Sequence, residues 1–292
     1  MRGNTGTFFE LIRVANVFTA AADVVAGYLC AGGSSADFGR WGPLCLASCC
    51  LYSGGMALND AWDAPKDASE RPERPIPSGR ISRHSAFRCA GILLAAGVIP
   101  AAWVSANTGA VAATMVAAIV LYDVLLKKTI LAPATMGVCR ALNLLLGMIA
   151  AGPMEESIAI LPMVILWLYV TSLTEFARRE ATGGNRNRLL VDMGGILVAV
   201  MAVPILPTTA VTQGPFFVVL LLTFLLALLC IGQRAIRSTS PADVRSAVGF
   251  FVLGIVVLDA CMVTRLRGIE AGSCLLVLLL PATWLSRRYR VS

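Results

Sequence analysis

The chain has 292 residues, of which 57% are hydrophobic and 14% charged, and its formal net charge is +7. Soluble domains carry about 25% charged residues, so this composition excludes an ordinary soluble enzyme and predicts an integral membrane protein. The basic residues fall in short segments between apolar runs, as membrane topology requires, and therefore do not indicate nucleic-acid binding. The nine cysteines show no metal-ligand spacing and are interpreted as small hydrophobic residues.

Apolar runs long enough, or nearly long enough, to cross a bilayer recur along the whole chain. They cover Phe8–Cys30, Trp41–Leu58, His84–Val104, Thr108–Leu126, Pro133–Ala151, Ile158–Phe176, Leu189–Leu206, Gly214–Gln233, Val244–Val263 and Ala271–Leu285. We therefore expect an all-α bundle of about nine or ten transmembrane helices around a central cavity. No composition shift separates a second domain, so residues 1–292 are predicted to form one.

Lysine and arginine are distributed unequally between the segments that join these runs. Most lie before the first run, after the second, fourth, sixth and eighth runs, and at the C-terminus, whereas the other side holds only Arg40, Arg265 and Arg267. The positive-inside rule then predicts that both termini and the segment after Leu58 face the cytoplasm. We expect a multi-pass protein of a bacterial inner membrane.

An acidic cluster follows the second apolar run. Asp60, Asp63 and Asp67 are three and four residues apart, so on a continued helix their carboxylates line one face. Such carboxylates repel one another unless a cation lies among them, and Mg²⁺ accepts one or two carboxylates together with water and substrate phosphates. Arg71 and Arg74 follow and are suited to phosphate oxygens. A solvated loop would explain the arginines equally well, but not three regularly spaced aspartates.

The residues from Asn59 to Ser82 carry a longer motif. They read NDxxDxxxD followed by RPxRPIPSGxIS, which resembles the first signature of the UbiA superfamily of intramembrane prenyltransferases. The resemblance implies an all-helical fold, an isoprenyl diphosphate bound through Mg²⁺ on two Asp-rich motifs, and transfer of the prenyl group to an acceptor, aromatic or lipid-like. Asn59 would support the three aspartates. Arg140-Ala141-Leu142-Asn143 and the run from Thr174 to Glu180 look like the branch called EboC.

Polar residues inside the apolar runs are the next group, because such residues need a partner or a function. UbiA-like proteins have a similar Arg-x-x-Asn in the first helix and a Tyr followed by Lys in the fourth. The resemblance therefore implies that Asn16, Tyr122 and Lys127 reach the diphosphate or the acceptor.

Arg140 is a further candidate for the substrate site. The competing interpretation is a structural ion pair of Arg140 with Asp23 or Asp123. For these two aspartates, and for Asp259, we favour the structural interpretation.

The position of the family's second Asp-rich motif is occupied here by a stretch without aspartate, 171–186. Glu175 and Glu180 are five residues apart, which places them about 140° apart on a helix. In the favoured interpretation either glutamate still binds metal, while Arg178 and Arg179 replace the second Mg²⁺ on the leaving diphosphate. In the alternative, the second motif has too few acidic residues to support catalysis, and the protein binds or transports a prenylated lipid. An unrelated ion transporter is disfavoured because the densest acids lie at a helix end.

The predicted reaction is Mg²⁺-dependent prenyl transfer within the membrane. Asp60, Asp63 and Asp67 would hold the metal on the diphosphate, and the allylic cation would form in a cavity that excludes water. From helix position alone, the prenyl chain is expected beside several large apolar side chains. These are Phe18, Met56, Trp62, Leu144 and Phe176.

Overall fold

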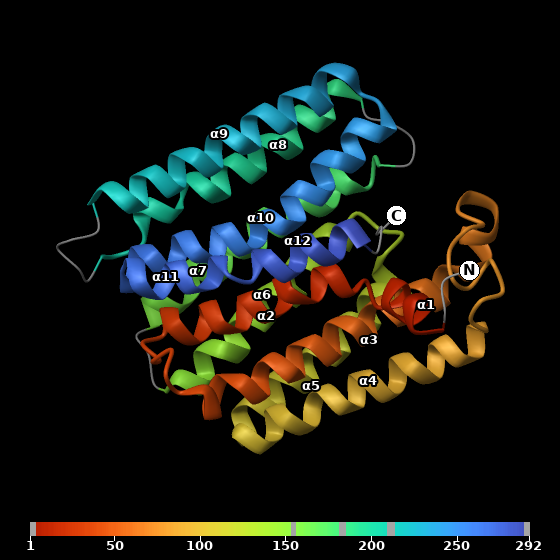
Figure 1. The fold of residues 1–292 in the computed structure, drawn as a ribbon, viewed down its shortest axis with the longest axis horizontal. Coiled ribbons are helices and arrows are strands. Elements are labelled where there is room, and N and C mark those ends of the chain that lie inside the picture. The colour runs from red at the N-terminus through yellow and green to blue at the C-terminus, as the bar shows by residue number, and fades with distance from the viewer. Residues whose placement is uncertain (1–3, 153–155, 181–184, 209–213, 289–292) are drawn as a thin grey trace.

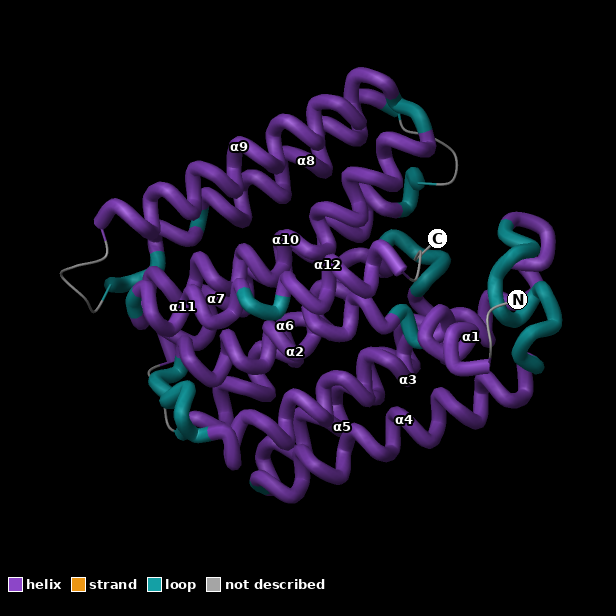
Figure 2. Tube along the Cα trace, viewed as in Figure 1, coloured by secondary structure: helices purple, strands orange, loops and turns teal. Residues whose placement is uncertain are grey.

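Figure 1 shows the computed structural model as a set of long helices that run roughly along one direction. The structure describes residues 4–152, 156–180, 185–208 and 214–288, and within them it contains helices, turns and loops but no strand (Figure 2). The α-helices are α1 Asn4–Leu11, α2 Val14–Cys30, α3 Phe38–Glu70, α4 Arg83–Val104, α5 Ala106–Leu121, α6 Ala132–Ala151, α7 Glu156–Ala177, α8 Arg186–Met201, α9 Gly214–Ser238, α10 Pro241–Arg267, α11 Ile269–Leu276 and α12 Leu279–Arg288. A π-helix, η1 (Tyr122–Leu126), continues α5, and a 3₁₀ turn, η2 (Val203–Ile205), follows α8.

The number of spans agrees with the sequence pattern. Among the described residues, nine helical segments are long and apolar enough to cross a membrane, counting α11 and α12 as one, and α2 is a further apolar helix of 17 residues. Each of the ten predicted apolar runs coincides with one of these segments. The prediction of an all-α, multi-pass membrane bundle is confirmed.

The helices form a layered bundle in which α2, α6, α7 and α10 occupy the middle. α2 contacts both α6 and α10, and α7 contacts both α6 and α10. The pair α8 and α9 lies along one edge of the molecule and the pair α4 and α5 along the opposite edge (Figure 1). This arrangement leaves the four middle helices, with α3 and α5, to surround the interior.

Two glycines allow α2 and α6 to approach closely. A Cβ atom at Gly27 would lie 2.0 Å from the carbonyl oxygen of Leu144, and one at Gly147 would lie 2.0 Å from the carbonyl oxygen of Val24. In a bilayer, helices associate through such close backbone contacts because lipid supplies no hydrophobic driving force. The crossing fixes the distance between two walls of the interior.

Helix α3 is the longest, with 33 residues, which corresponds to about 50 Å and exceeds the roughly 30 Å hydrocarbon core of a bilayer. It continues past Leu58, where the apolar run ends, so the aspartate motif is helical as predicted. Pro65 lies inside this helix and cannot donate to the carbonyl of Ala61. Arg83 Nε donates to that oxygen instead, at 2.8 Å, and connects α3 to the start of α4.

Candidate active site

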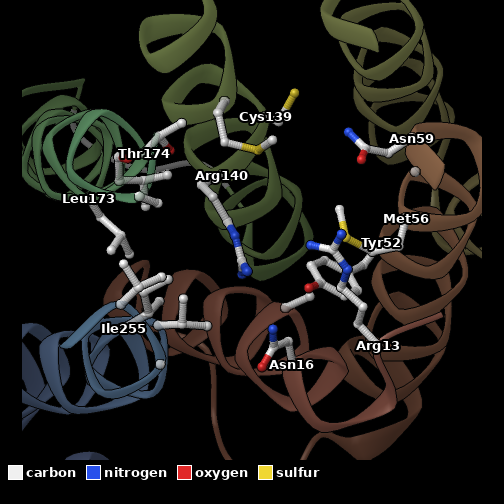
Figure 3. Close-up of a pocket in the computed structure, with 18 of the residues that line it drawn as sticks. Arg13, Asn16, Tyr52, Met56, Asn59, Cys139, Arg140, Leu173, Thr174 and Ile255 are labelled. Carbon is white, nitrogen blue, oxygen red and sulfur yellow. Dashed lines mark hydrogen bonds between the residues drawn. The ribbon is translucent and has the colours of Figure 1, made fainter. Parts of the chain in front are cut away.

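A cavity of about 1200 Å³ lies between α2, α3, α5, α6, α7 and α10. Figure 3 shows side chains from several of these helices pointing into it, among them Arg13 and Arg140. Arginines and carboxylates at its walls are Arg13, Arg71, Arg74, Asp123, Arg140, Glu180 and Arg245. Apolar side chains such as Leu51, Met115, Ile119, Val170, Leu173 and Val252 form much of the rest. The cavity therefore combines a basic region with walls suited to a hydrocarbon chain.

Asp60 and Asp67 lie on the same face of α3 and share one cation. Arg74 Nη1 is 2.8 Å from Asp67 Oδ2 and 3.5 Å from Asp60 Oδ1. Asp60 Oδ1 also accepts a hydrogen bond from Arg13 Nη2 at 3.2 Å. All of these groups except Arg13 are buried, and a buried carboxylate requires such a partner. The segment after α3 thus turns back so that its own arginine neutralises the acids of the helix.

The third aspartate and the preceding asparagine have partners on the neighbouring helix. Asp63 forms an ion pair with Lys127, which follows η1. Like Asp60 and Asp67, neither residue belongs to the cavity lining, which Arg74 and Asn59 reach instead. Asn59 Nδ2 donates to Asp123 Oδ1 at 2.7 Å, and both residues line the cavity. The widened turn of η1 lies at this contact, as π-turns often do at functional sites. Asp123 therefore pairs with Asn59 rather than with Arg140.

Arg13 occupies a strained position between α1 and α2. Its backbone angles are φ 49° and ψ 53°, in the left-handed region, which costs a non-glycine residue about 1–3 kcal/mol. Arg13 lies just before the spanning segment. Burial lowers its pKa, but the charge of Asp60 and other neighbours more than offsets this effect, so the pKa is raised above its ordinary value. The strain is retained where the side chain reaches the aspartate cluster.

Arg140 lies deeper in the bundle and forms a buried network. Its Nη1 donates to Asp23 Oδ2 at 2.8 Å and its Nη2 to Thr19 Oγ1 at 2.8 Å. Asn143 Nδ2 also donates to Asp23 Oδ2, at 3.0 Å. The structural ion pair of Arg140 with Asp23 is therefore present, and it fixes the guanidinium group over the ring of Tyr52 at the cavity wall.

In the stretch that replaces the second Asp-rich motif, Glu175 pairs with Arg178 and Arg179, and Arg179 also pairs with Asp192 of α8. Glu175 lies 3.2 Å from Arg178 Nη1 and 3.2 Å from Arg179 Nη2. Arg179 Nη1 is also 2.9 Å from Asp192 Oδ2 on α8. Glu175, Arg178 and Arg179 are absent from the cavity lining among the described residues. Their predicted contacts with metal or diphosphate stay predictions.

Glu180 takes a different direction, because α7 ends at Ala177 and Glu180 lies in the turn that follows, where the predicted helical angle to Glu175 does not apply. Its carboxylate lines the cavity and accepts a hydrogen bond from Arg245 Nε of α10 at 3.0 Å. Asn16 and Tyr122 line the cavity as well. Of the five side chains predicted beside the prenyl chain, Met56 is the one found in the lining among the described residues; Phe176 is buried against Phe251 instead.

The aspartates of α3 offer oxygen ligands of the kind that Mg²⁺ prefers. Among the described residues, no group of three or more His, Cys, Asp or Glu side chains is close enough to hold a metal ion. Mg²⁺ does not need such a group, since it takes one or two carboxylates and completes its shell with water and substrate phosphates. Asp60 and Asp67 converge on a single cationic atom, Arg74 Nη1. Two hard oxygen donors around one cation position fit Mg²⁺ bound together with a diphosphate.

The two ends of the described chain lie near this site. Ser286 of α12 lines the cavity, and Glu10 of α1 accepts a hydrogen bond at 2.7 Å from Arg80 Nη1, in the segment after α3. The hydrogen bond to Glu10 raises the pKa of Arg80. The predicted placement of both ends on the same side as the aspartate motif agrees with this geometry, and the predicted cytoplasmic orientation stays a prediction.

Comparisons with known proteins agree with the fold and the motif. Residues 20–255 match the model of the UbiA prenyltransferase family. The digeranylgeranylglyceryl phosphate synthase of Ignicoccus hospitalis is 30% identical over 267 residues, which cover 89% of this chain and 80% of that protein. Among solved structures, a UbiA homologue from Aeropyrum pernix K1 has a TM-score of 0.66 at 14% identity, covering 85% of this chain and 97% of that one.

A second solved structure is a UbiA homologue from Archaeoglobus fulgidus bound to GPP and Mg²⁺. Its TM-score is 0.57 at 12% identity, and the match covers 88% of this chain and 99% of that one. This chain belongs to the UbiA prenyltransferase family. The predicted superfamily and the predicted enzyme class are confirmed, while the resemblance to the EboC branch stays a prediction.

Proposed function

We propose that this protein transfers a prenyl group from an isoprenyl diphosphate to a lipid-like acceptor in an Mg²⁺-dependent reaction within the membrane. The observation that carries the proposal is the convergence of Asp60 and Asp67 on Arg74 beside a cavity whose remaining walls are largely apolar. Support for the donor comes from the family and from the Archaeoglobus fulgidus homologue bound to GPP and Mg²⁺.

The first-motif residues would bind the charged end of the donor. Asp60 and Asp67, with Asp63 beside them, would hold Mg²⁺, which supplies positive charge to the leaving diphosphate when bound. Arg71 lines the cavity, and its side chain makes no hydrogen bond or ion pair with the described residues. We assign it to the phosphate oxygens, for which guanidinium is suited. We also assign Asn16 and Tyr122 to the substrate, because both residues line the cavity.

The bond changes follow from the donor chemistry. The bond between the prenyl carbon and the diphosphate oxygen breaks, and its electron pair stays on the diphosphate. An acceptor atom forms the new bond to the prenyl carbon and loses its proton to the surrounding medium. The apolar walls, including Met115, Ile119 and Leu173, exclude water that would otherwise trap the allylic cation.

For the acceptor we favour a lipid alcohol that bears a phosphate. Relatives similar over most of this chain are digeranylgeranylglyceryl phosphate synthases, and the basic cavity suits an anionic acceptor. An aromatic acceptor is the competing class, and a prenylated glyceryl phosphate and an aromatic acid can be compared in one assay.

The test uses purified protein in lipid nanodiscs with a labelled isoprenyl diphosphate. We expect Mg²⁺-dependent release of diphosphate and transfer of the label, both lost in Asp60→Ala and Asp63→Ala. Glu70→Gln is the matched control, because Glu70 lies on the same helix, is exposed and pairs with Lys66. Binding of the donor without any release of diphosphate would support a carrier and contradict the proposal.

A further inference from the structure

An arginine outside the predicted site residues lines the cavity on α10, away from α3. Arg245 lies one turn into α10, and its Nε donates to Glu180 Oε1 at 3.0 Å. Both residues line the cavity. The Glu180–Arg245 pair therefore joins the end of α7 to the start of α10 at the position where the family has its second acidic motif.

The hydrogen-bonding capacity of Arg245 is only partly used. Nε is committed to Glu180, while Nη1 and Nη2 make no hydrogen bond with any described residue. Guanidinium has five N–H donors in a fixed plane, so anchoring through Nε leaves the two terminal groups oriented together. Ser246 follows Arg245 on α10 and also lines the cavity. The side chain of Arg245 is 53% exposed, so these unused donors are accessible to an anion that enters the cavity.

The two walls belong to one cavity. Arg13 and Arg74, which both pair with Asp60, line this cavity together with Glu180 and Arg245. A diphosphate bound in the cavity beside Arg13 and Arg74 would therefore have the α3 motif on one side and Arg245 on the other.

We propose that Arg245, oriented by Glu180, binds the diphosphate through Nη1 and Nη2 in place of a second metal ion, so that this protein uses Mg²⁺ on the α3 side only. The inference rests on the function proposed above. It differs from the sequence-based expectation, which gave this role to Arg178 and Arg179. Those two guanidinium groups are bound to Glu175 outside the described cavity lining.

The chemistry of the second wall supports one fixed cation there. Glu180 is the one carboxylate of that wall among the described lining residues, and it already holds Arg245. A metal at this position would need Glu180 to release the arginine and would find no second carboxylate beside it. Fixed guanidinium donors stabilise charge that develops on a leaving group without any reorganisation.

The first experiment measures binding of inorganic pyrophosphate with Mg²⁺ by calorimetry on the full chain in detergent. Arg245→Gln is expected to weaken binding about 10- to 100-fold, as for other hydrogen bonds to charged groups, and Arg245→Lys should recover part of the loss. Arg234→Gln is the matched control. Arg234 forms a similar pair, Nε to Asp243 Oδ1 at 2.9 Å, near the same end of α10 but off the cavity, and its loss should leave binding within about twofold.

Two further variants separate this inference from the function on which it rests. If Asp60→Asn abolishes Mg²⁺-dependent binding while Arg245→Gln binds as wild type does, the function stands and the role of Arg245 is overturned. If wild-type protein shows no Mg²⁺-dependent binding, the proposed function itself fails. Glu180→Gln should weaken pyrophosphate binding severalfold without changing the Mg²⁺ requirement, since Glu180 is a positioning residue; a changed Mg²⁺ requirement would make it a metal ligand and overturn the inference.

The second experiment counts the metal ions directly. With Mn²⁺ in place of Mg²⁺ and pyrophosphate bound, electron paramagnetic resonance should detect a single protein-bound Mn²⁺ without dipolar coupling to another. A coupled Mn²⁺ pair in the wild-type protein would contradict the inference.

Discussion

The two walls of the cavity carry the same kinds of charged group but arrange them differently. On the α3 side, Arg74 and Arg13 line the cavity and are held by aspartates behind them, since two aspartates share Arg74 and Asp60 has a second partner in Arg13. On the opposite wall, Glu180 lines the cavity and is bound to Arg245 of α10. In our proposals, the two aspartates that share Arg74 would exchange this cation for Mg²⁺, whereas Glu180 would orient Arg245 toward the diphosphate.

The largest effect should follow from breaking the α3 wall. Asp67→Asn removes the closer of the two carboxylates that hold Arg74. We expect the rate of prenyl transfer to fall about 10²- to 10³-fold, the usual loss when one preorganised electrostatic contact to a transition state is removed. Steady-state assays of diphosphate release measure it, with Glu70→Gln as control. A loss smaller than fivefold would show that Asp67 is not part of the metal site.

Loss of the buried ion pair between Arg140 and Asp23 should lower the stability of the protein more than it lowers the rate of prenyl transfer. Arg140→Met leaves Asp23 buried without its ionic partner, and breaking one side of such a pair costs about 3–5 kcal/mol. Thermal unfolding in detergent measures the loss. The double variant Arg140→Met with Asp23→Leu should recover much of the stability, because no unpaired charge remains. Failure of the double variant to recover would show that Asp23 has another essential partner.

The two glutamates of the second wall region, Glu175 and Glu180, should differ in their effect on activity. Glu175→Gln should change kcat/KM by less than about twofold, because Glu175 pairs with Arg178 and Arg179 away from the cavity and such partly exposed pairs contribute little. Kinetics at limiting donor measures it beside Glu180→Gln. If Glu175→Gln reduces turnover more strongly than Glu180→Gln does, the assignment of the two glutamates is reversed.

The smallest effect on stability and activity is expected in the loop that follows α3. Arg80→Ala removes the contact with Glu10 of α1, and such pairs near solvent stabilise a protein by about 0–1 kcal/mol. Unfolding in detergent should shift only slightly, and prenyl transfer should persist. Complete loss of transfer in this variant would place Arg80 at the substrate.

Much of the fold could be predicted because it depends on local patterns. Nine of the ten apolar runs coincide with helical segments long enough to cross a membrane, and the first run is divided at Arg13 between α1 and the shorter α2. The spacing of Asp60, Asp63 and Asp67 correctly predicted that the helix continues through them. The site depends on contacts between distant segments, which periodicity does not reveal. Arg245 and Glu180 are 65 residues apart in the chain and meet only because α7 packs on α10.

Two other partners were missed for related reasons. Arg13 reaches Asp60, 47 residues away, through a left-handed backbone conformation that its sequence does not signal. Asp23 and Asp123 were both candidate partners of Arg140; Asp23 is the partner found, and Asp123, in the π-turn η1, accepts a hydrogen bond from Asn59 instead. The π-turn interrupts a run that the sequence predicts as continuous helix, so the contact between Asn59 and Asp123 had no signal in the periodicity.

The most direct measurement is a structure of the protein with Mn²⁺ and a non-hydrolysable prenyl thiolodiphosphate, with the metal located by anomalous scattering. The account predicts Mn²⁺ beside Asp60 and Asp67, the diphosphate between that metal and Arg245, and the prenyl chain along the apolar walls. Mn²⁺ bound between Glu175 and Glu180, or a diphosphate bound outside the cavity, would contradict it.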